Sequence, residues 1–382
     1  MKKSQIKGAK ISLNKNLKET IVSILKKMFQ NDCCDAILMP MQVPAKDSYA
    51  WVLIKDKKLI DDANPIAPVM PVQGAKALSN FSRKGESKLK ILAVMKPCEI
   101  RAVVELSKLN QINLENITLI SYDCPGALSI KNYREDPDKA EKKFTDMLKK
   151  PEFLDNYVKS VCKNCDNFSL LPVCDLHVGY YKSDKNNVFL IPNSKRGKQN
   201  LEKLNMKTPQ DLSEWMQDIE EIRKKRVKNK QERFKQIKNM VEGFDSLRDT
   251  FTHCIGCHNC RSACPICYCR QCYFDSESAK TETDMMLLNA EKRGAITFPL
   301  DRIIFQVGRM SHMSLSCVSC GLCTDACPVS IPVADIFSYV AENTQKQFGY
   351  KSGNDKTEQI PLKTFQLQEV GGIKELVKDA EG

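Results

Sequence analysis

The segment CIGCHNCRSACPICYCRQC, residues 254–272, places seven cysteines within nineteen positions. The first four have the spacing C-x2-C-x2-C-x3-C and are followed by a proline, and the same spacing, again followed by proline, recurs at residues 317–328. Three thiolates in one tight loop can face three corners of an iron–sulfur cube, while the fourth reaches across to a second cube. Zinc sites usually use two cysteine pairs, without the third cysteine. The repeated motif therefore predicts two 4Fe–4S clusters.

The crossed arrangement assigns to each cluster three cysteines of one motif and the last cysteine of the other. The first cluster is expected to bind Cys254, Cys257, Cys260 and Cys327. The second cluster is expected to bind Cys317, Cys320, Cys323 and Cys264.

The segment between the motifs is more than fifty residues long and has a helical pattern. This part of the chain resembles the helical ferredoxin domains of succinate dehydrogenase and heterodisulfide reductase subunits, which carry electrons within complexes. Cys267, Cys269 and Cys272 have no evident fourth ligand, so they are expected to surround a cluster rather than to bind another metal.

The composition favours metal ligation over disulfide bonds. The chain has 382 residues, 18 cysteines and a formal net charge of +12. The lysines near its N-terminus precede no continuous apolar stretch, and no run of about 18 apolar residues occurs, so we expect a cytoplasmic protein without direct membrane insertion. Thiols stay reduced in the cytosol. Three clusters of about −2 each would lower the net charge to about +6, so a zinc-stabilised nucleic-acid-binding protein is the weaker alternative.

The pattern of apolar residues divides the chain into four parts. Residues 1–204 alternate short apolar runs with helix-like segments, which predicts an α/β domain with a mixed sheet flanked by helices. Residues 205–250 are highly charged with apolar positions about one turn apart, as in a long helical linker. Residues 251–345 are expected to form the mainly helical ferredoxin domain, and residues 346–382 a polar tail that is docked on another subunit or disordered.

A second set of cysteines lies in the first domain. Cys98 and Cys124 each follow a predicted strand, so both can lie at the same edge of a parallel sheet, where ligand sites collect. Cys162 and Cys165 form a C-x2-C pair further along the chain. Spacing alone leaves buried free thiols as an alternative to a third metal site.

Four stretches of this domain carry a family resemblance. They are NPIAPVMP at 64–71, KPCEIRAVVELSKL at 96–109, YDCPG at 122–126 and CKNCDNFSLLPVCDLHVG at 162–179. With the two ferredoxin motifs, the chain resembles the beta subunits of coenzyme F420-reducing hydrogenases and F420-dependent formate dehydrogenases. The likeness covers about residues 50–345 and is greatest to the formate dehydrogenase beta subunit, in which the clusters follow the flavin domain.

The resemblance implies a third 4Fe–4S cluster beside an FAD. Cys98, Cys124, Cys162 and Cys165 match the cysteines of that cluster. Neither a GxGxxG fingerprint nor a Walker loop is present, so the FAD assignment rests on the resemblance. Asn64, Met70 and Lys96 are the expected neighbours of the flavin, and Lys96 would meet the negative charge of the reduced form.

The implied function is electron transfer within an oxidoreductase complex. A two-electron carrier such as coenzyme F420 would exchange electrons with the flavin, and three clusters would connect it to a catalytic subunit of the formate dehydrogenase or hydrogenase type, or to a heterodisulfide reductase-like subunit. The alternatives are NAD(P)H or proteins as the only electron partners, and a flavin-free adaptor that uses the ferredoxin clusters alone.

Several residues fall outside this scheme. Cys174 stands where the family more usually has alanine, and Cys33 and Cys34 are expected to be small core residues. The four histidines, His177, His253, His258 and His312, have no visible acid–base partner and are expected to be structural or to surround a cluster.

Overall fold

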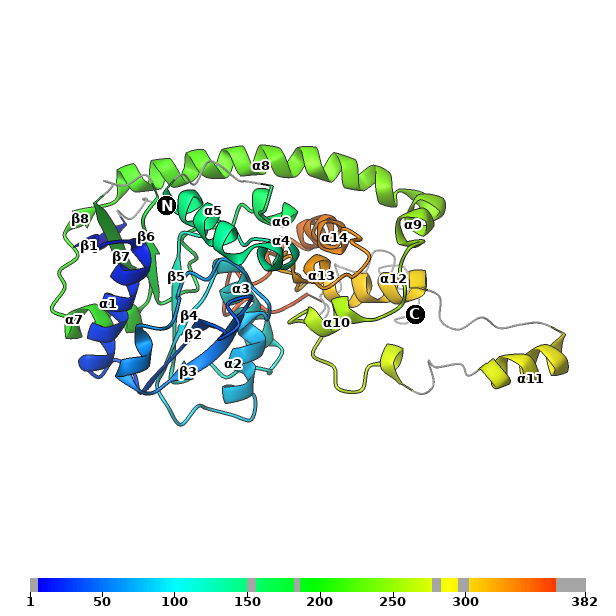
Figure 1. Ribbon diagram of the computed structural model, residues 1–382, viewed down its shortest axis with the longest axis horizontal. Coiled ribbons are helices and arrows are strands. Elements are labelled where there is room, and N and C mark those ends of the chain that lie inside the picture. Colours follow the sequence, from blue (N-terminus) through cyan, green and yellow to red (C-terminus); the bar gives the residue numbers. More distant parts are fainter. Residues whose placement is uncertain (1–5, 150–155, 182–185, 277–282, 295–301, 362–382) are drawn as a thin grey trace, which may run out of the picture.

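The computed structural model describes residues 6–149, 156–181, 186–276, 283–294 and 302–361. Figure 1 shows an α/β part at one end of the molecule, a helical part at the other, and the long helix α8 running past both. The expected fold class, an α/β domain followed by a mainly helical ferredoxin domain, is therefore confirmed. No helix in the described ranges is long and apolar enough to cross a membrane.

One mixed sheet with the strand order β3-β2-β4-β5-β6-β7-β1-β8 forms the centre of the α/β part. The neighbouring strands β2, β4, β5 and β6 run parallel, and the other neighbours are antiparallel. The carboxyl ends of the four parallel strands therefore meet at one edge. The strands are β1 (Lys7–Ser12), β2 (Ala36–Gln42), β3 (Tyr49–Ile54), β4 (Ile91–Val94), β5 (Ile117–Tyr122), β6 (Leu176–Gly179), β7 (Asn187–Pro192) and β8 (Gln210–Asp211).

Helices cover both faces of the sheet because successive strand residues point to opposite sides. In β4, Leu92 and Val94 pack in the apolar cluster that contains residues of α1 and α5, whereas Ile91 and Ala93 pack with residues of α2 and α3. The helices of this part are α1 (Leu17–Gln30), α2 (Gly74–Ser82), α3 (Pro97–Lys108), α4 (Ile130–Glu135), α5 (Pro137–Lys149), α6 (Ser160–Lys163) and α7 (Lys195–Lys203), with a 3-10 turn η1 (Lys57–Ile60).

The helical part shares its apolar core with the α/β part. Phe305 of α12 and Phe337 of α14 belong to the same buried cluster as Val103 of α3. This continuity means that packing, and not a flexible connection, sets the distance between the two parts. The elements here are α8 (Ser213–Val241), α9 (Gly243–Phe251), α10 (Asn259–Ala263), η2 (Tyr273–Asp275), α11 (Thr283–Arg293), α12 (Arg302–Met313), α13 (Leu322–Asp325) and α14 (Val333–Gln347).

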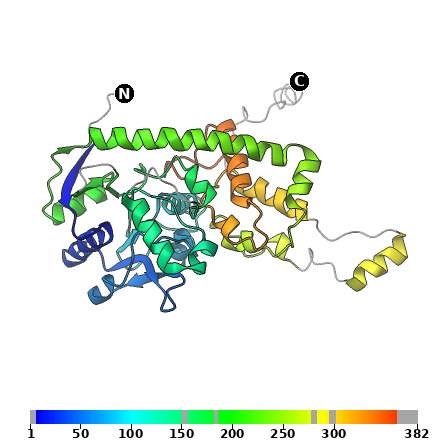
Figure 2. The same ribbon diagram turned by 45° about the horizontal axis from the view of Figure 1, so that its top comes forward.

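Helix α8 lies in the range expected for a helical linker, and it also has a buried side. Trp215 and Ile219 near its start pack with Phe168 of the α/β part, and Ile237 near its end joins the core shared with the ferredoxin helices. Arg233 forms an ion pair of 3.0 Å with Asp335 of α14. Both views show α8 extending over the two parts, so it fastens them to each other (Figures 1 and 2).

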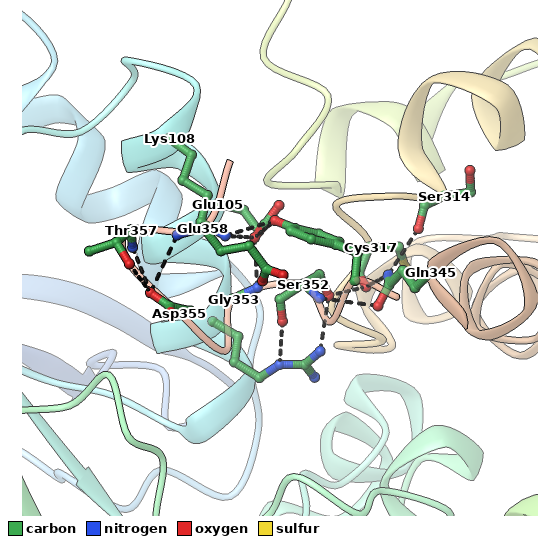
Figure 3. A network of polar contacts seen from close by, with 12 residues as sticks. Glu105, Lys108, Ser314, Cys317, Gln345, Ser352, Gly353, Asp355, Thr357 and Glu358 are labelled. Atoms are coloured by element: carbon green, nitrogen blue, oxygen red, sulfur yellow. Dashed lines mark hydrogen bonds and ion pairs between the residues drawn. The ribbon is translucent and has the colours of Figure 1, made fainter. Parts of the chain in front are cut away.

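Residues 348–361, here called the C-terminal strap, lie in the range expected for the polar tail. Their backbone and side chains bond to α3 and to the loop that carries Cys317 (Figure 3). Arg101 Nε and Nη2 each donate to Ser352 over 2.9 Å, and Gly353 N donates to Glu105 over 2.6 Å. Ser352 Oγ donates to the Cys317 carbonyl over 2.8 Å. The strap thus holds a cysteine loop against the α/β part. Residues 362–382 lie outside the described residues, and docking of the tail on another subunit stays a prediction.

Gly353→Ala should release this strap. Gly353 has φ +66°, and a Cβ there would lie 2.5 Å from Arg101 Cα, so the strap could not approach α3. Gly349 has φ +60° but nothing within 4 Å of its Cβ position, which makes Gly349→Ala the matched control. We expect Gly349→Ala to cost about 1 kcal/mol of unfolding free energy and Gly353→Ala about twice that or more, measured by urea denaturation. Equal losses in the two variants would contradict the tight contact.

Candidate functional site

The first set of cysteines meets at the carboxyl edge of the parallel strands. Cys98 lies in the first turn of α3, directly beyond β4, and Cys124 follows β5, where its N–H donates to Phe168 O over 2.7 Å. Cys162 lies in α6, and Cys165 follows that helix. We call these four residues the proximal site.

The four cysteines of the proximal site are buried or only partly exposed. Burial raises the pKa of Cys98 well above its ordinary value, and Glu99, Cys320, Cys124 and Cys162 raise it further. Burial likewise raises the pKa of Cys124 to about 12, with Lys96 opposing the shift and Cys162 adding to it. Such buried thiols become thiolates only with a metal or a cation beside them.

Glycine allows the two segments of the proximal site to approach. Gly126 has φ +108°, and a Cβ there would lie 3.2 Å from the Cys162 Cβ. One residue later, Ala127 N donates to the Cys162 Sγ over 3.4 Å. Backbone N–H groups aimed at sulfur are typical of iron–sulfur sites, where they stabilise the thiolate.

A buried carboxylate network holds the backbone before Cys124. Asp123 Oδ2 accepts hydrogen bonds from Tyr180 N at 2.7 Å, Tyr181 N at 3.0 Å and Trp215 Nε1 at 3.1 Å. His177 Nε2 lies 3.0 Å from Asp123 Oδ1, so a proton on Nε2 completes the network. Burial alone would raise the pKa of Asp123, but the hydrogen bonds from His177 and Ser169 outweigh it and lower the pKa. The structural role expected for His177 agrees with this position.

The second set of cysteines lines one cavity of about 440 Å³ between the two ferredoxin motifs. Cys317, Cys320 and Cys323 come from one motif and Cys264 from the other, and Arg309 and Phe337 complete the wall. The structure therefore brings together the four residues that the crossed arrangement assigns to the second cluster. We call this set the middle site.

The third set lies on the far side of Arg309. Cys254 and Cys260 are buried and Cys257 is exposed, and Gln306 Nε2 lies 3.9 Å from the sulfurs of both buried residues. Cys327 follows α13 and packs against the same apolar cluster as Cys260. Helices α10 and α13 pack together, which brings the two motifs side by side. We call Cys254, Cys257, Cys260 and Cys327 the distal site.

The three sites follow one another through the molecule. Lys159 connects the first two, because its ammonium is close enough to Cys162 and Cys320 for both thiols to raise its pKa. Arg309 connects the second pair, since it lines the middle cavity and its Nη1 lies 3.1 Å from Cys260 Sγ of the distal site. The three cysteine sets therefore lie in the order proximal, middle, distal.

The three sites consist of cysteine thiols, the soft ligands that iron–sulfur clusters use. All eighteen cysteines are free thiols. Within the described ranges, no three His, Cys, Asp or Glu side chains converge closely enough to hold one metal ion. In a cube each thiolate binds a different iron, so its sulfurs lie further apart than the ligands of a single ion.

The three residues expected beside a flavin also lie together. Met70 and Lys96 line a cavity of about 210 Å³ with Tyr49 and Trp51. Asn64 Nδ2 donates to Tyr49 OH over 3.2 Å, and the buried Lys96 Nζ donates to Ala67 O over 2.8 Å. A larger hollow of about 1180 Å³ shares Tyr49 and Trp51, and its other wall comes from residues 265, 267 and 268 of the ferredoxin part.

The remaining thiols have separate surroundings. Cys267 Sγ lies 3.1 Å from Met313 Sδ beside the middle site, whereas Cys269 is exposed. Cys174 is buried and accepts a hydrogen bond of 3.1 Å from Asn193 Nδ2. Cys33 and Cys34 are buried in the core beside α1, as expected for small core residues.

Sequence reasoning missed the charged residues around the sites. Lys159 and Asp325 form a buried ion pair between the proximal and middle sites, with side chains 4% and 5% exposed. Burial would lower the pKa of Lys159, but Asp325 and the nearby thiols outweigh it and raise the pKa. In the sequence, Asp325 stands between two cysteines of the second motif, and this position could have indicated a role beside a cluster. No neighbouring residue indicates that Lys159 is its partner.

Asp325→Asn should destabilise the protein strongly. The change leaves the Lys159 ammonium buried without its carboxylate, which typically costs about 3–5 kcal/mol of unfolding free energy. Lys238→Gln is the control, because the Lys238–Glu242 pair is 56% and 63% exposed. An exposed pair contributes at most about 1 kcal/mol. Urea denaturation of the two variants measures both effects, and similar small losses would refute a structural role for the buried pair.

Asp123→Asn should cost about 2–3 kcal/mol, because buried N–H groups lose a charged acceptor. The lowered pKa of Asp123 means that its stabilisation is present above the usual aspartate value of about 3.9 and is lost as the pH falls through the folded value. The difference in unfolding free energy between the wild type and the variant should therefore shrink in acid. Asp249→Asn, at a carboxylate 70% exposed, should show neither effect.

Known proteins resemble this chain over much of its length. Residues 250–331 match the family model described as a 4Fe-4S dicluster domain. The F420-dependent formate dehydrogenase subunit beta of Methanocaldococcus jannaschii is 30% identical over 300 residues, which cover 70% of this chain and 75% of that protein. The F420-dependent formate dehydrogenase 1 subunit beta of Methanococcus maripaludis is 30% identical over 307 residues, 70% of this chain and 73% of that protein.

Chains of solved structures also resemble this one. A chain of the F420-reducing NiFe hydrogenase complex from Methanosarcina barkeri aligns with 61% of this chain and 94% of its own length, at 12% identity and a TM-score of 0.44. The family assignment rests instead on the two sequence relatives. The chain belongs to the family of F420-dependent formate dehydrogenase beta subunits, which are subunits of oxidoreductase complexes.

Proposed function

We propose that this subunit relays electrons between coenzyme F420 and a formate dehydrogenase catalytic subunit, through FAD and three 4Fe–4S clusters. The observation that carries the proposal is the succession of three cysteine sets, each with four thiols, connected by Lys159 and Arg309. A chain of one-electron centres can connect a two-electron carrier with a distant protein partner.

The proposed ligands follow the three sites. The proximal cluster binds Cys98, Cys124, Cys162 and Cys165. The middle cluster binds Cys317, Cys320, Cys323 and Cys264. The distal cluster binds Cys254, Cys257, Cys260 and Cys327. The common cavity of the middle set supports the crossed assignment most directly, because a ligand from the other motif is part of its wall.

When bound, FAD would supply the chemistry that links hydride transfer to single-electron transfer. Lys96, which is 3% exposed, would place a positive charge near the flavin and Cys124, while Asn64 and Met70 would shape the adjoining pocket. A buried cation at this position favours a negatively charged reduced cofactor.

The names of the relatives support F420 as the two-electron carrier and a formate dehydrogenase as the complex. A hydrogenase-type catalytic subunit or a heterodisulfide reductase-like subunit is the alternative protein partner, and NAD(P)H the alternative carrier. The second candidate function is a flavin-free adaptor, which the narrow pocket at Lys96 favours because its lining side chains leave little space between them.

Anaerobic purification followed by iron, sulfide and flavin quantification on one sample tests the proposal. We expect about twelve iron and twelve sulfide ions with one FAD per chain. About eight of each without flavin would support the adaptor instead. A sample with flavin can then be assayed, with its catalytic partner, for reduction of F420 against NAD(P)+.

Cys327→Ser tests the crossed ligands. The cluster bound mainly by the first motif, at residues 254–260, should lose its spectroscopic signature, because a serine oxygen is a poor replacement for a thiolate ligand of iron. Cys269→Ser changes an exposed thiol of the same segment and should leave the iron content and the spectra unaltered. Electron paramagnetic resonance of the reduced proteins distinguishes the clusters, and an intact distal signal in Cys327→Ser would disprove the assignment.

A further inference from the structure

Arg309 of α12 makes a direct contact with the distal site. Its side chain is 3% exposed, Nη1 donates to Cys260 Sγ over 3.1 Å, and Nη2 donates to the Cys260 carbonyl over 3.2 Å. The planar guanidinium therefore bonds to both the sulfur and the backbone of one cysteine. Such a fork holds its partner in one orientation.

The same guanidinium also faces the middle site. Arg309 lines the cavity of about 440 Å³ with Cys264, Cys317, Cys320 and Cys323. Burial would lower the pKa of Arg309, but Cys260, Cys267, Cys264 and Cys323 outweigh it and raise the pKa. Thiols of both sites thus surround a single cation.

Within the part of the chain that the structure describes, no carboxylate pairs with this cation. Its Nε has no hydrogen-bond partner there, and the rings of Phe305 and Phe337 lie 5.8 Å and 4.7 Å from its Cζ. A buried guanidinium without a counterion is unfavourable unless an anion is bound beside it. Two clusters that each carry about −2 would supply that charge.

The preceding junction has the opposite arrangement. Lys159 lies between the proximal and middle sites, but Asp325 pairs with it and cancels its charge. Arg309, in contrast, has no paired carboxylate in the described part of the chain, so the junction between the middle and distal sites keeps its positive charge. A net cation beside a cluster stabilises the reduced, more negative form and raises the reduction potential.

We infer that Arg309 is a positioning residue shared by the middle and distal clusters, and that its charge and its N–H···S bond raise the reduction potentials of both. The inference rests on the proposed function, because it requires the two clusters. Arg309 would thus keep the middle cluster reducible by the proximal cluster, and the distal cluster reducible by the middle cluster.

Redox titration followed by electron paramagnetic resonance tests the inference on the anaerobically purified full chain. The test variant is Arg309→Gln, which removes the charge but retains a hydrogen-bond donor. The control is Arg261→Gln, which removes the same charge one residue from Cys260, where Asp275 already compensates it. Iron and sulfide are quantified for each sample before the titration.

We expect Arg309→Gln to retain its iron and to lower both midpoint potentials, with the reduced-to-oxidised ratio of each cluster falling about tenfold at a given ambient potential, or about 59 mV for one electron. Arg261→Gln should leave the ratio within about twofold of the wild type. Wild-type potentials in an iron-replete Arg309→Gln protein would overturn the inference. So would a change confined to one of the two clusters, because the charge is shared.

If the glutamine variant fails to assemble clusters, Arg309→Lys tests the inference instead. Lysine keeps the charge but lacks the fork, so midpoint potentials within about twofold in reduced-to-oxidised ratio of the wild type support the electrostatic role. A tenfold or greater fall in the lysine variant, which retains the charge, would show that the charge does not set the potentials and would overturn the electrostatic role. A wild-type protein without iron and sulfide would refute the proposed function itself, which separates the two failures.

Discussion

Compensation of buried thiolate charge is the constraint on which the rest of this structure depends. Cysteines that bind a cluster are anionic, and burying anions is unfavourable unless cations or N–H groups lie beside them. A buried basic side chain adjoins each site. Arg226 of α8 is 2% exposed, lies 4.1 Å from the centre of the Phe168 ring and lowers the pKa of Cys165 against the effect of burial. Lys159 lies between the proximal and middle sites, and Arg309 lies between the middle and distal sites.

The helices that close the fold are also the ones that deliver these charges. Helix α8 buries Trp215 against the α/β part and places Arg226 near the proximal site. Helix α12 contributes Phe305 to the shared core and Arg309 to the cysteines. The same helices therefore supply both the apolar core and the compensating charges. A change in their packing would alter the electrostatics of the cluster sites as well.

The sequence predicted the type of each element well where the pattern was local. Buried residues of α1 recur at helical spacing, with Asn16 as its N-cap, and β4 is a short apolar run that lies at the centre of the sheet. The charged pattern of α8 indicated a helix but concealed its buried side, because its apolar residues are few and are separated by lysines and arginines. The network of the strap with Glu105 also escaped prediction, since a polar segment without periodicity gives no sign of the surface that it contacts.

By itself, the sequence determined the chemistry of this protein. The spacing of cysteines within each motif is a property of a few consecutive residues, so it predicts sulfur ligands, their number and a cube-shaped cluster. Only the tertiary structure decided how the three sites follow one another and which cations lie between them. The Lys159–Asp325 pair and the Arg309–Cys260 contact join segments far apart in the chain. Such contacts depend on how helices pack over the whole fold, and no local pattern encodes that packing.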